Sequence, residues 1–366
     1  MMDTKLDDSR LTASARGLEG PRLKIDFSLV IHGPDHVELR SGGFNAVSHF
    51  LRDEDQNGQL AAILKHLDGR SVRDVARETG ARRAMIEDLI DHLYQIGAIQ
   101  DGPEHVLDAY FDRIFPSLRS RDTGLSARMP ATIIGAGAIG DMLAASIREL
   151  LPDADVAVLG DEDPTMRALR ILTLSRFEKG LDRATIEEDF MPLKGRLLIL
   201  PQLPIDPHRA LVLNRLALLL GSPWLWGAAD GPTLFVGPLT VPDASACFQC
   251  CETRVTMNLR ETASYQRYKS ALAEGQVRQA PLKIETALQH ILAGHMALEA
   301  VNYLVTGTTF TIGKTLSLYM PTMEFCFHDI LRLPGCPACG PEAFVEEPEL
   351  YYDMRALLDT SVGASR

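Results

Sequence analysis

The 366-residue sequence contains no run of apolar residues that approaches the ~18 needed to cross a membrane. Residues 1–22 mix acidic and basic side chains without the apolar core of a signal peptide, so we expect a disordered arm there. Basic residues are also scarce, because 37 Lys and Arg face 49 Asp and Glu, for a net charge of −12. A nucleic-acid binder normally shows a basic surplus. We therefore expect a cytoplasmic globular protein that contacts neither membranes nor nucleic acid.

Cysteine is infrequent, with six in the chain, but four of them form two Cys-x-x-Cys pairs. In a chain of intracellular character this spacing favours metal binding over disulfide formation. Each Cys-x-x-Cys turn directs two thiolates at one ion, and two such turns complete the tetrahedron that Zn²⁺ prefers. Because four thiolates leave no open coordination position, the predicted zinc is structural. The candidate ligands are Cys247, Cys250, Cys336 and Cys339. The alternative is two unrelated pairs of redox or buried cysteines.

The other two cysteines are not expected to bind the metal. Cys251 adjoins a candidate ligand, and we interpret it as a bystander. Cys326 lies in a segment whose alternation is typical of a strand, so we expect a buried, inert thiol. A nucleophilic role would need a neighbouring base, and His328 lies two residues away on the same strand face.

Residues 23–102 have the pattern of a small independent domain. Its first part alternates apolar and polar residues, which predicts strands, and its second part has helical periodicity. Ser71 is placed to cap the second of three helices and Gly80 to end it. Strands followed by three helices, the last two joined by a tight turn, indicate a winged helix-turn-helix. Residues 58–100 hold six Lys or Arg and six Asp or Glu, so a peptide ligand is at least as plausible as DNA.

A connecting helix and loop are expected at residues 103–130, and a second composition begins at residue 131. Residues 131–366 alternate strand and helix patterns, which predicts an α/β domain with a parallel, doubly wound sheet. A glycine-rich turn with Gly135, Gly137 and Gly140 follows the first strand and opens a helix, as in nucleotide-binding proteins. Asp161 and Asp163, at the end of the second strand, suit the ribose of such a nucleotide. The alternative is a turn that serves packing alone.

Three segments together resemble a known family: the GAGAIG turn, the stretch GPLTVPDASACFQC at residues 237–250, and the terminal PGCPACG. They are similar to the ThiF-like, ubiquitin-activating-enzyme-like fold. More narrowly, they resemble the ThiF-like "C" proteins of thiazole/oxazole-modified peptide (TOMM) biosynthesis, a class of RiPP pathway. Those proteins place a PqqD-like winged-helix domain before the ThiF-like domain, and the order of elements in 23–102 and the turn at residues 67–69 match it. The resemblance implies a Rossmann-type, doubly wound sheet with a four-cysteine zinc site at residues 131–366.

The resemblance also implies a function and partners. Such a chain binds the leader of a ribosomally made precursor peptide and presents it to a YcaO-type cyclodehydratase, which forms azolines at Cys, Ser or Thr. The leader is expected to add as a strand to the edge at residues 44–50 and to contact the third helix. Homodimerisation is a further implication, with the charged segment 255–285 as a candidate crossing loop. The candidate peptide-binding residues are Phe44, Val47, Phe50, Arg82, Arg83, Ile86 and Ile90.

Two other functions stay open from the sequence. The first is an ATP-dependent adenylyltransferase that acts on a peptide carboxylate. Against it, the region 161–177 lacks the Asn and Arg-Gln contacts of adenylating relatives, although Asp230 is a candidate Mg²⁺ ligand. The second is a transcription regulator, since Arg82 and Arg83 open the helix that would enter the major groove. The sequence favours a component that does not itself adenylate and leaves ATP use to its partner.

Overall fold

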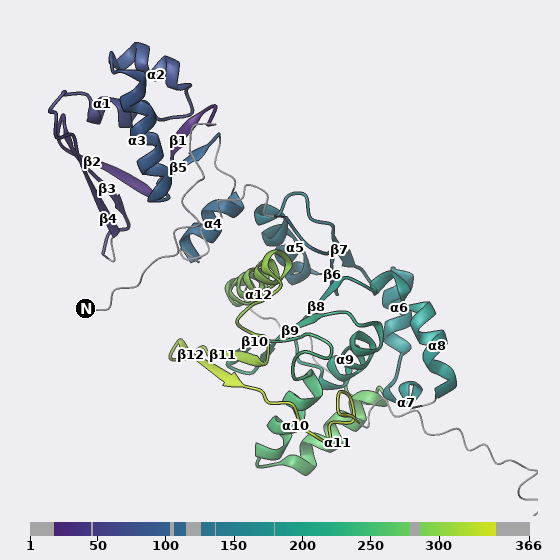
Figure 1. Cartoon of the computed structure of the whole chain (residues 1–366). Coiled ribbons are helices and arrows are strands. Elements are labelled where there is room, and N and C mark those ends of the chain that lie inside the picture. The colour runs from purple at the N-terminus through teal and green to yellow at the C-terminus, as the bar shows by residue number, and fades with distance from the viewer. Residues whose placement is uncertain are drawn as a thin grey trace, which may run out of the picture. The chain divides into compact units, whose positions relative to one another are not determined.

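The computed structural model describes residues 18–44, 47–102, 106–114, 126–135, 137–178, 180–278 and 286–341. The chain divides into two compact units, Met1–Leu125 and Ser126–Arg366 (Figure 1). Within the expected connection, residues 106–114 form a helix of the first unit, and residues 126–130 belong to the second. Among the described residues, no helix is both long and apolar enough to span a bilayer.

The first unit contains the predicted strands and helices in the predicted order. Its three-stranded sheet is antiparallel throughout, and β1 pairs with β5 in a separate small sheet. The expected strand at residues 44–50 begins three residues later than its predicted start. The strands are β1 (Pro21–Leu23), β2 (Phe27–Gly33), β3 (His36–Ser41), β4 (Val47–Arg52) and β5 (Ile99–Asp101). The helices are α1 (Leu60–His66), α2 (Val72–Thr79), α3 (Arg83–Gln95) and α4 (Val106–Ile114).

Local sequence explains where the helices of the first unit begin and end. Ser71 caps α2, because its hydroxyl oxygen accepts a hydrogen bond from the backbone N–H of Asp74 at 3.2 Å. Gly80 ends α2 in the left-handed conformation, with φ 70°, which favours glycine. One face of β3 carries the buried residues Val37 and Leu39, which share a core with α1 and α3. The unit therefore folds around one apolar core.

The second unit is a seven-stranded sheet in the order β12-β11-β10-β9-β8-β6-β7. The strands are β6 (Ala131–Ile134), β7 (Val156–Leu159), β8 (Leu197–Gln202), β9 (Trp224–Asp230), β10 (Thr233–Thr240), β11 (Lys314–Tyr319) and β12 (Glu324–Asp329). Strands β7, β6, β8 and β9 are parallel, whereas β10, β11 and β12 pair antiparallel. The expected parallel sheet is therefore found for β7, β6, β8 and β9 but not for β10, β11 and β12. Only residues 231–232 join β9 to β10, and a parallel crossover needs about a dozen residues.

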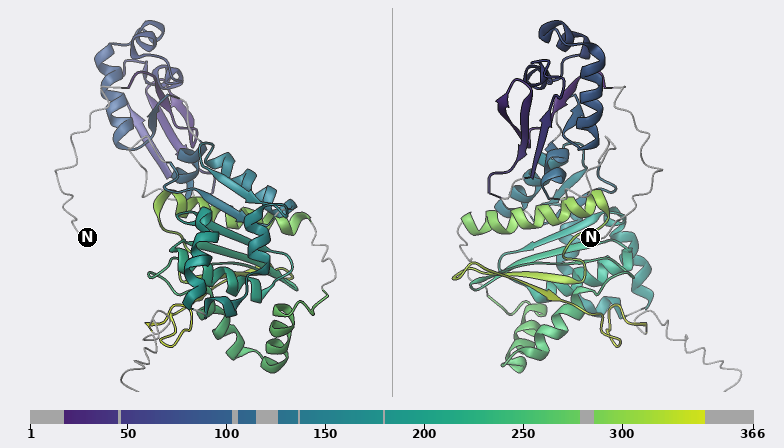
Figure 2. Two further views of the ribbon diagram at one scale, coloured as in Figure 1. Left: turned by 90° about the vertical axis from the view of Figure 1, so that its right-hand side faces the viewer. Right: turned by 60° about the vertical axis from the view of Figure 1, so that its left-hand side comes forward.

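Helices cover both faces of this sheet. Helices α5 and α12 pack against each other, and α12 crosses one face (Figure 2). Helix α9 packs on the opposite face of β9, α10 contacts α9 and β10, and α11 contacts α9 and α10. The helices are α5 (Ala138–Leu150), α6 (Pro164–Ile171), α7 (Leu174–Phe177), α8 (Gly180–Asp189), α9 (Pro207–Leu220), α10 (Phe248–Asn258), α11 (Thr262–Ala273) and α12 (Thr286–Thr306). The result is a mixed α/β, Rossmann-like architecture with a parallel half.

Candidate functional sites

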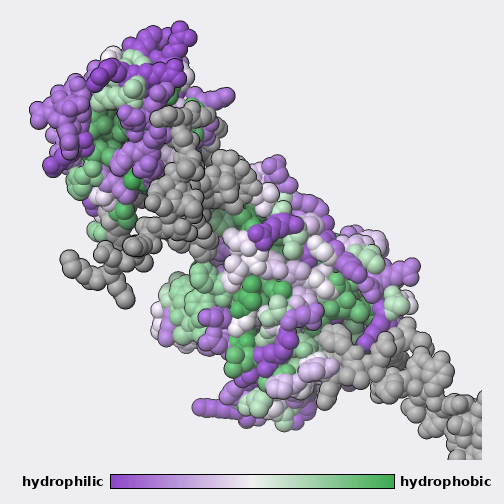
Figure 3. Space-filling model, in the orientation of Figure 1, coloured by the Kyte–Doolittle hydropathy of each residue, from purple (hydrophilic) through white to green (hydrophobic). Residues whose placement is uncertain are grey.

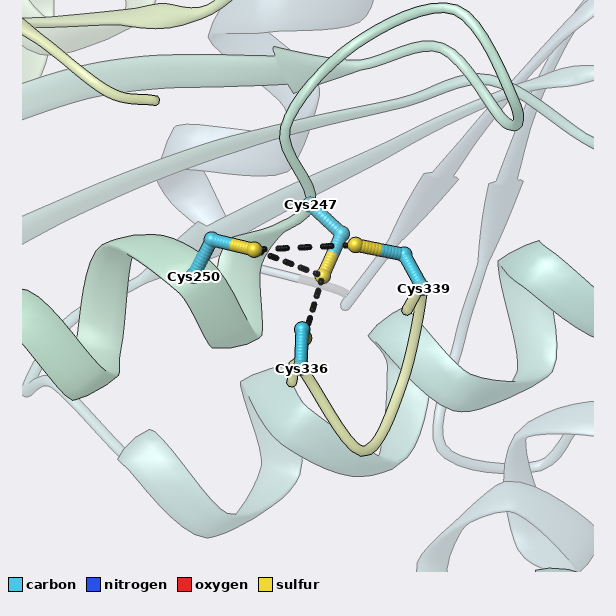
Figure 4. A group of neighbouring side chains, drawn as sticks. All are labelled: Cys247, Cys250, Cys336 and Cys339. Atoms are coloured by element: carbon cyan, nitrogen blue, oxygen red, sulfur yellow. Dashed lines mark hydrogen bonds between the residues drawn. The ribbon is translucent and has the colours of Figure 1, made fainter. Parts of the chain in front are cut away.

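The structure brings the four candidate metal ligands together in one buried cluster (Figure 4). The Sγ atoms of Cys247 and Cys336 are 3.8 Å apart, and those of Cys250 and Cys339 are 3.6 Å apart. The Sγ atoms of Cys247 and Cys250 are 4.0 Å apart. Tetrahedral coordination with metal–sulfur bonds of about 2.3 Å places the sulfurs about 3.8 Å from one another. The observed spacing therefore fits one tetrahedral metal ion, and four thiolates are a donor set that suits zinc.

Two segments distant in sequence build this cluster. Cys247 is the N-cap of α10 and Cys250 lies in its first turn, where its backbone N–H bonds the Cys247 carbonyl at 3.0 Å. Cys336 and Cys339 lie in a tight turn after β12 that Gly340 closes by donating to the Cys336 carbonyl at 2.8 Å. A Cβ atom at position 340 would meet that carbonyl oxygen at 2.6 Å, so the turn requires glycine. A bound metal would join the start of α10 to the segment after β12.

Cys251 and Cys326 lie outside the cluster. The Cys251 sulfur faces the Thr315 hydroxyl at 3.8 Å, and burial raises the pKa of the Cys251 thiol to about 11. The expectation of a buried Cys326 is wrong, because Cys326 lies on β12, whose residues are all exposed at the sheet edge. His328 Nε2 lies 2.7 Å from the Ser317 hydroxyl, so its near partner is a serine rather than Cys326.

The glycine-rich turn has the backbone that a phosphate-binding turn needs. Gly135 and Gly137 have φ of 120° and 124°, and a Cβ atom at either position would meet nothing within 4 Å. Gly140 serves packing, because a Cβ atom there would lie 2.6 Å from the Gly135 carbonyl oxygen. The turn therefore leaves space beside the start of α5, which is compatible with a phosphate group.

The acidic residues expected beside this turn have other partners. The Asp161 carboxylate accepts a hydrogen bond from the Arg170 guanidinium, which forms an ion pair with it at the surface. Asp163 caps α6, since its carboxylate accepts from the Thr165 N–H at 2.8 Å. Asp230 ends β9 and is exposed. A ribose would compete with Arg170 for Asp161, which weakens the case for a nucleotide site.

The candidate peptide-binding residues on the first sheet separate onto its two faces. Phe44 is exposed just before β4, and Val47 is 57% exposed. Since side chains alternate along a strand, Val47 shares its face with the core residue Leu51, whereas Phe50 points the other way. The Phe50 ring packs near His32, with ring centroids 6.3 Å apart, on the outer face of the sheet. Phe50 therefore does not form one surface with Val47.

The candidate residues on α3 also separate. Arg82 is the N-cap of α3 and Arg83 its first residue, and both are exposed. Ile86 is 0% exposed and belongs to the apolar core, so we revise its expected role from peptide contact to core packing. Ile90 is 3% exposed but lines a cavity.

That cavity has a volume of about 200 Å³ and lies where α2 begins beside α3. Apolar side chains from three segments and charged side chains of both signs surround it. The lining residues are Leu18, Glu19, Ser71, Val72, Arg73, Arg83, Glu87, Ile90 and Asp91. The sequence predicted two of them, Arg83 and Ile90. The others escaped prediction because no pattern links the segment before β1 to the starts of two helices.

Comparison with known proteins places the fold. No protein-family model matches the chain, and no curated protein matches its sequence. The fold is similar to those of several solved structures, which supports the resemblance predicted from the sequence at the level of the fold alone. Among solved structures, the heterocyclase TruD aligns with a TM-score of 0.59 and 20% identity, over 88% of this chain and 43% of TruD.

Two further structures are similar. A heterocyclase in complex with substrate and cofactor aligns with a TM-score of 0.59 and 16% identity, over 88% of this chain and 40% of its own. The microcin C7 biosynthetic enzyme MccB, in complex with N-formylated MccA, aligns with a TM-score of 0.50 and 12% identity, over 87% of this chain and 99% of MccB. The chain thus spans less than half the length of the two heterocyclases.

Proposed function

We propose that this chain binds the leader of a ribosomally made precursor peptide and presents it to a YcaO-type cyclodehydratase for azoline formation at Cys, Ser or Thr. The observation that carries the proposal is the alignment with the heterocyclase TruD over 88% of the chain. The second unit accounts for 241 of 366 residues, so the alignment includes much of the first unit. In this proposal the first unit is a PqqD-like peptide-recognition domain, and a YcaO-type cyclodehydratase is the partner.

The edge of β4 is the proposed leader-binding surface. Among the described residues β4 pairs only with β3, so its other edge presents backbone N–H and C=O groups to a ligand. An extended peptide can add there as a strand, with main-chain hydrogen bonds for affinity and side-chain contacts for selectivity. Val47 is the exposed apolar contact on the core side of this edge. The cavity with Arg83 and Ile90 is a second place that can receive a peptide side chain.

The second unit contributes a scaffold rather than chemistry in this proposal. Its four-cysteine cluster is proposed to hold a structural Zn²⁺, because four thiolates leave no position for a substrate. Tethering the leader raises the effective concentration of the core peptide at the partner's active site. Adenylation by this chain is the alternative function, and the ion pair between Asp161 and Arg170 disfavours it. Pyrophosphate exchange with ATP and a peptide substrate tests that alternative.

The partner is proposed to dock on the exposed edge strand β12. Phe325 and Phe327 are 49% and 57% exposed on the face where Leu316 and Leu318 are buried, so apolar surface continues beyond the covered core. Apolar surface is visible in Figure 3 where α12 and the β11–β12 hairpin reach the front. The chain spans 43% of the length of TruD, and in this proposal the YcaO-type cyclodehydratase is the partner that docks at β12. Homodimerisation through residues 255–285 stays a prediction.

Fluorescence polarisation with a labelled synthetic leader tests leader binding. The full chain should bind the leader, and a chain without residues 1–102 should not, because the proposed β4 edge is then absent. The truncated chain keeps its own sheet, core and cysteine cluster, so circular dichroism and bound zinc report whether it is folded. Unchanged affinity after removal of the first unit would overturn the proposal.

A further inference from the structure

Two consecutive residues of α9 hold the two cysteine pairs of the cluster. Asn214 Oδ1 accepts a hydrogen bond from the backbone N–H of Phe248 at 3.0 Å. The Arg215 guanidinium donates to the backbone carbonyl of Pro337. Phe248 follows the first cysteine of one Cys-x-x-Cys turn, and Pro337 follows the first cysteine of the other. One turn of α9 is therefore tied to the equivalent position in both pairs.

The Asn214 side chain is in an environment that an apolar residue would otherwise suit. It is 0% exposed, and its Nδ2 has no hydrogen-bond partner among the described residues. A buried donor without a partner is unfavourable relative to the same donor in solvent. Leucine has nearly the same shape and carries no such cost. The bond from Phe248 to Oδ1 is therefore the interaction that explains asparagine at this position.

Arg215 contributes a positive charge near the cluster as well as a hydrogen bond that orients one cysteine turn. Four thiolates around one divalent cation carry a net negative charge, and burial of uncompensated charge is unfavourable. Burial lowers the pKa of the Arg215 guanidinium, and the charges of Cys336 and Cys247 act against that shift. A guanidinium is also a planar, fixed fork, so it fixes the direction of its bond to a carbonyl better than an ammonium group does.

We propose that Asn214 and Arg215 are positioning residues for the metal centre, which orient the two Cys-x-x-Cys turns toward each other. Asn214 fixes the turn at the start of α10. Arg215 fixes the turn after β12 and offsets the negative charge of the thiolates. The proposal rests on the proposed zinc site. If the purified wild-type chain held no zinc after reconstitution, the zinc site itself would fail, which differs from the outcomes below.

The test is the rate at which the full, zinc-loaded chain releases Zn²⁺ to the chelating dye 4-(2-pyridylazo)resorcinol. Asn214→Leu and Arg215→Gln should release zinc roughly 10–100-fold faster than wild type, in line with the loss of metal affinity that is typical when an outer-shell contact of a metal site is removed. Arg209→Gln is the matched control, because Arg209 lies on the same helix but donates to the carbonyls of Leu169 and Leu172. The control should release zinc at the wild-type rate.

Two further measurements separate positioning from general stability. Arg215→Lys keeps the charge but loses the fork, so its release rate should lie between those of wild type and Arg215→Gln. In the Co²⁺-loaded chain, Arg215→Gln should move the thiolate-to-metal absorption band to longer wavelength, because the thiolates lose a nearby positive charge. Arg209→Gln should leave that band in place. Wild-type release rates in Asn214→Leu and Arg215→Gln, or an unmoved band in Arg215→Gln, would overturn the proposal. If Arg215→Gln fails to fold, the release rates of Arg215→Lys and wild type are compared instead. Equal release rates of these two proteins would reject the proposed role of the guanidinium fork.

Discussion

Lys269 Nζ on α11 donates a hydrogen bond to Glu252 Oε1 on α10 at 2.7 Å, and the Glu252 carboxylate is 6% exposed. The same oxygen accepts from the Tyr265 hydroxyl at 3.1 Å and from the Thr256 hydroxyl at 3.3 Å. Burial and the Glu252 charge raise the pKa of Tyr265, so it stays a donor. Since no residue of α11 is buried, these polar contacts attach α11 to α10, next to the cysteine cluster.

The ion pair between Lys269 and Glu252 should therefore be sensitive to loss of one partner. Lys269→Met leaves a buried carboxylate without its cation, which should lower the free energy of unfolding by about 3–5 kcal/mol. Urea denaturation followed by the fluorescence of Trp224 and Trp226, both in the second unit, measures it. Lys194→Met is the control, because its pair with Glu187 is half-exposed, and it should cost less than about 1 kcal/mol. Equal effects of the two substitutions would contradict the role of burial.

The six cysteines should fall into three reactivity classes. In the zinc-loaded chain, Cys326 is exposed and should react at once with 5,5′-dithiobis(2-nitrobenzoic acid) at about pH 8. Cys251 should react slowly, because burial raises the pKa of its thiol to about 11 and leaves little thiolate. The four clustered cysteines should react only after a chelator removes the metal. Cys326→Ser should abolish the fast phase, and fast reaction of the clustered thiols in the loaded chain would contradict a bound metal.

Cysteine spacing predicted this cluster because the geometry of a Cys-x-x-Cys turn is local. The two thiolates of one turn are already held close by the short chain between them, and only the meeting of the two turns depends on the fold. The helix ends of the first unit were predictable for a similar reason, since caps such as Ser71 and the left-handed Gly80 act within one turn. The glycine-rich turn was predictable for the same reason, because its contacts are local and Gly140 packs against the nearby Gly135.

Features that depend on contacts between distant segments could not be predicted from the sequence. No pattern relates Asn214 to Phe248 or Arg215 to Pro337, so the ties between α9 and the cysteine turns emerge only from the fold. The exposure of Cys326 depends on β12 being the edge strand, and alternation alone does not distinguish an edge from a central strand. Ile86 was chosen for its periodicity, but the side of a helix that faces the core is set by its neighbours.

Acid should weaken the first unit through Glu38. The hydrogen bond from the Ser48 hydroxyl, at 2.6 Å, lowers the pKa of the Glu38 carboxyl below its ordinary value of 4.5, with further contributions from His32 and Arg40. A lowered folded-state pKa stabilises the fold above the unfolded value, and this contribution is lost as pH falls through the folded value. The protection of amide hydrogens across residues 27–52, measured relative to the intrinsic exchange rate at each pH, should therefore decrease as the pH falls below 4.5.

Glu38→Gln is the control for that prediction. Glutamine keeps an acceptor for the Ser48 hydroxyl but has no proton to gain in this range, so it should reduce the change in exchange on acidification. Both tryptophans lie in the second unit, so their fluorescence should not follow this transition. An identical acid dependence in Glu38→Gln and wild type would assign the effect to other groups.

Partner docking should depend on β12. Phe327→Ser removes an aromatic ring that is 57% exposed, so it should change the free energy of unfolding little. The same substitution should reduce co-purification with the cyclodehydratase about tenfold or more. Phe310→Ser is a matched control, because Phe310 is 58% exposed and lies before β11 rather than on the edge strand. Equal capture by both variants would reject β12 as the docking surface. A loss of self-association in Phe327→Ser, with capture unchanged, would show that β12 binds a second copy instead.

The two edges of the first sheet give the sharpest test of leader recognition. Val47 on β4 is 57% exposed and Ile31 on β2 is 43% exposed, so an arginine is tolerated at either position without loss of the core. Val47→Arg should weaken leader binding about tenfold or more, because it places a charge beside the proposed added strand and removes its apolar contact. Ile31→Arg lies on the strand at the opposite edge, since β3 separates β2 from β4, and should bind the leader as wild type does. If Ile31→Arg alone weakened binding, the leader would add to β2. If neither changed the affinity, the cavity between α2 and α3 would be the remaining candidate, and Arg83→Glu would then test it.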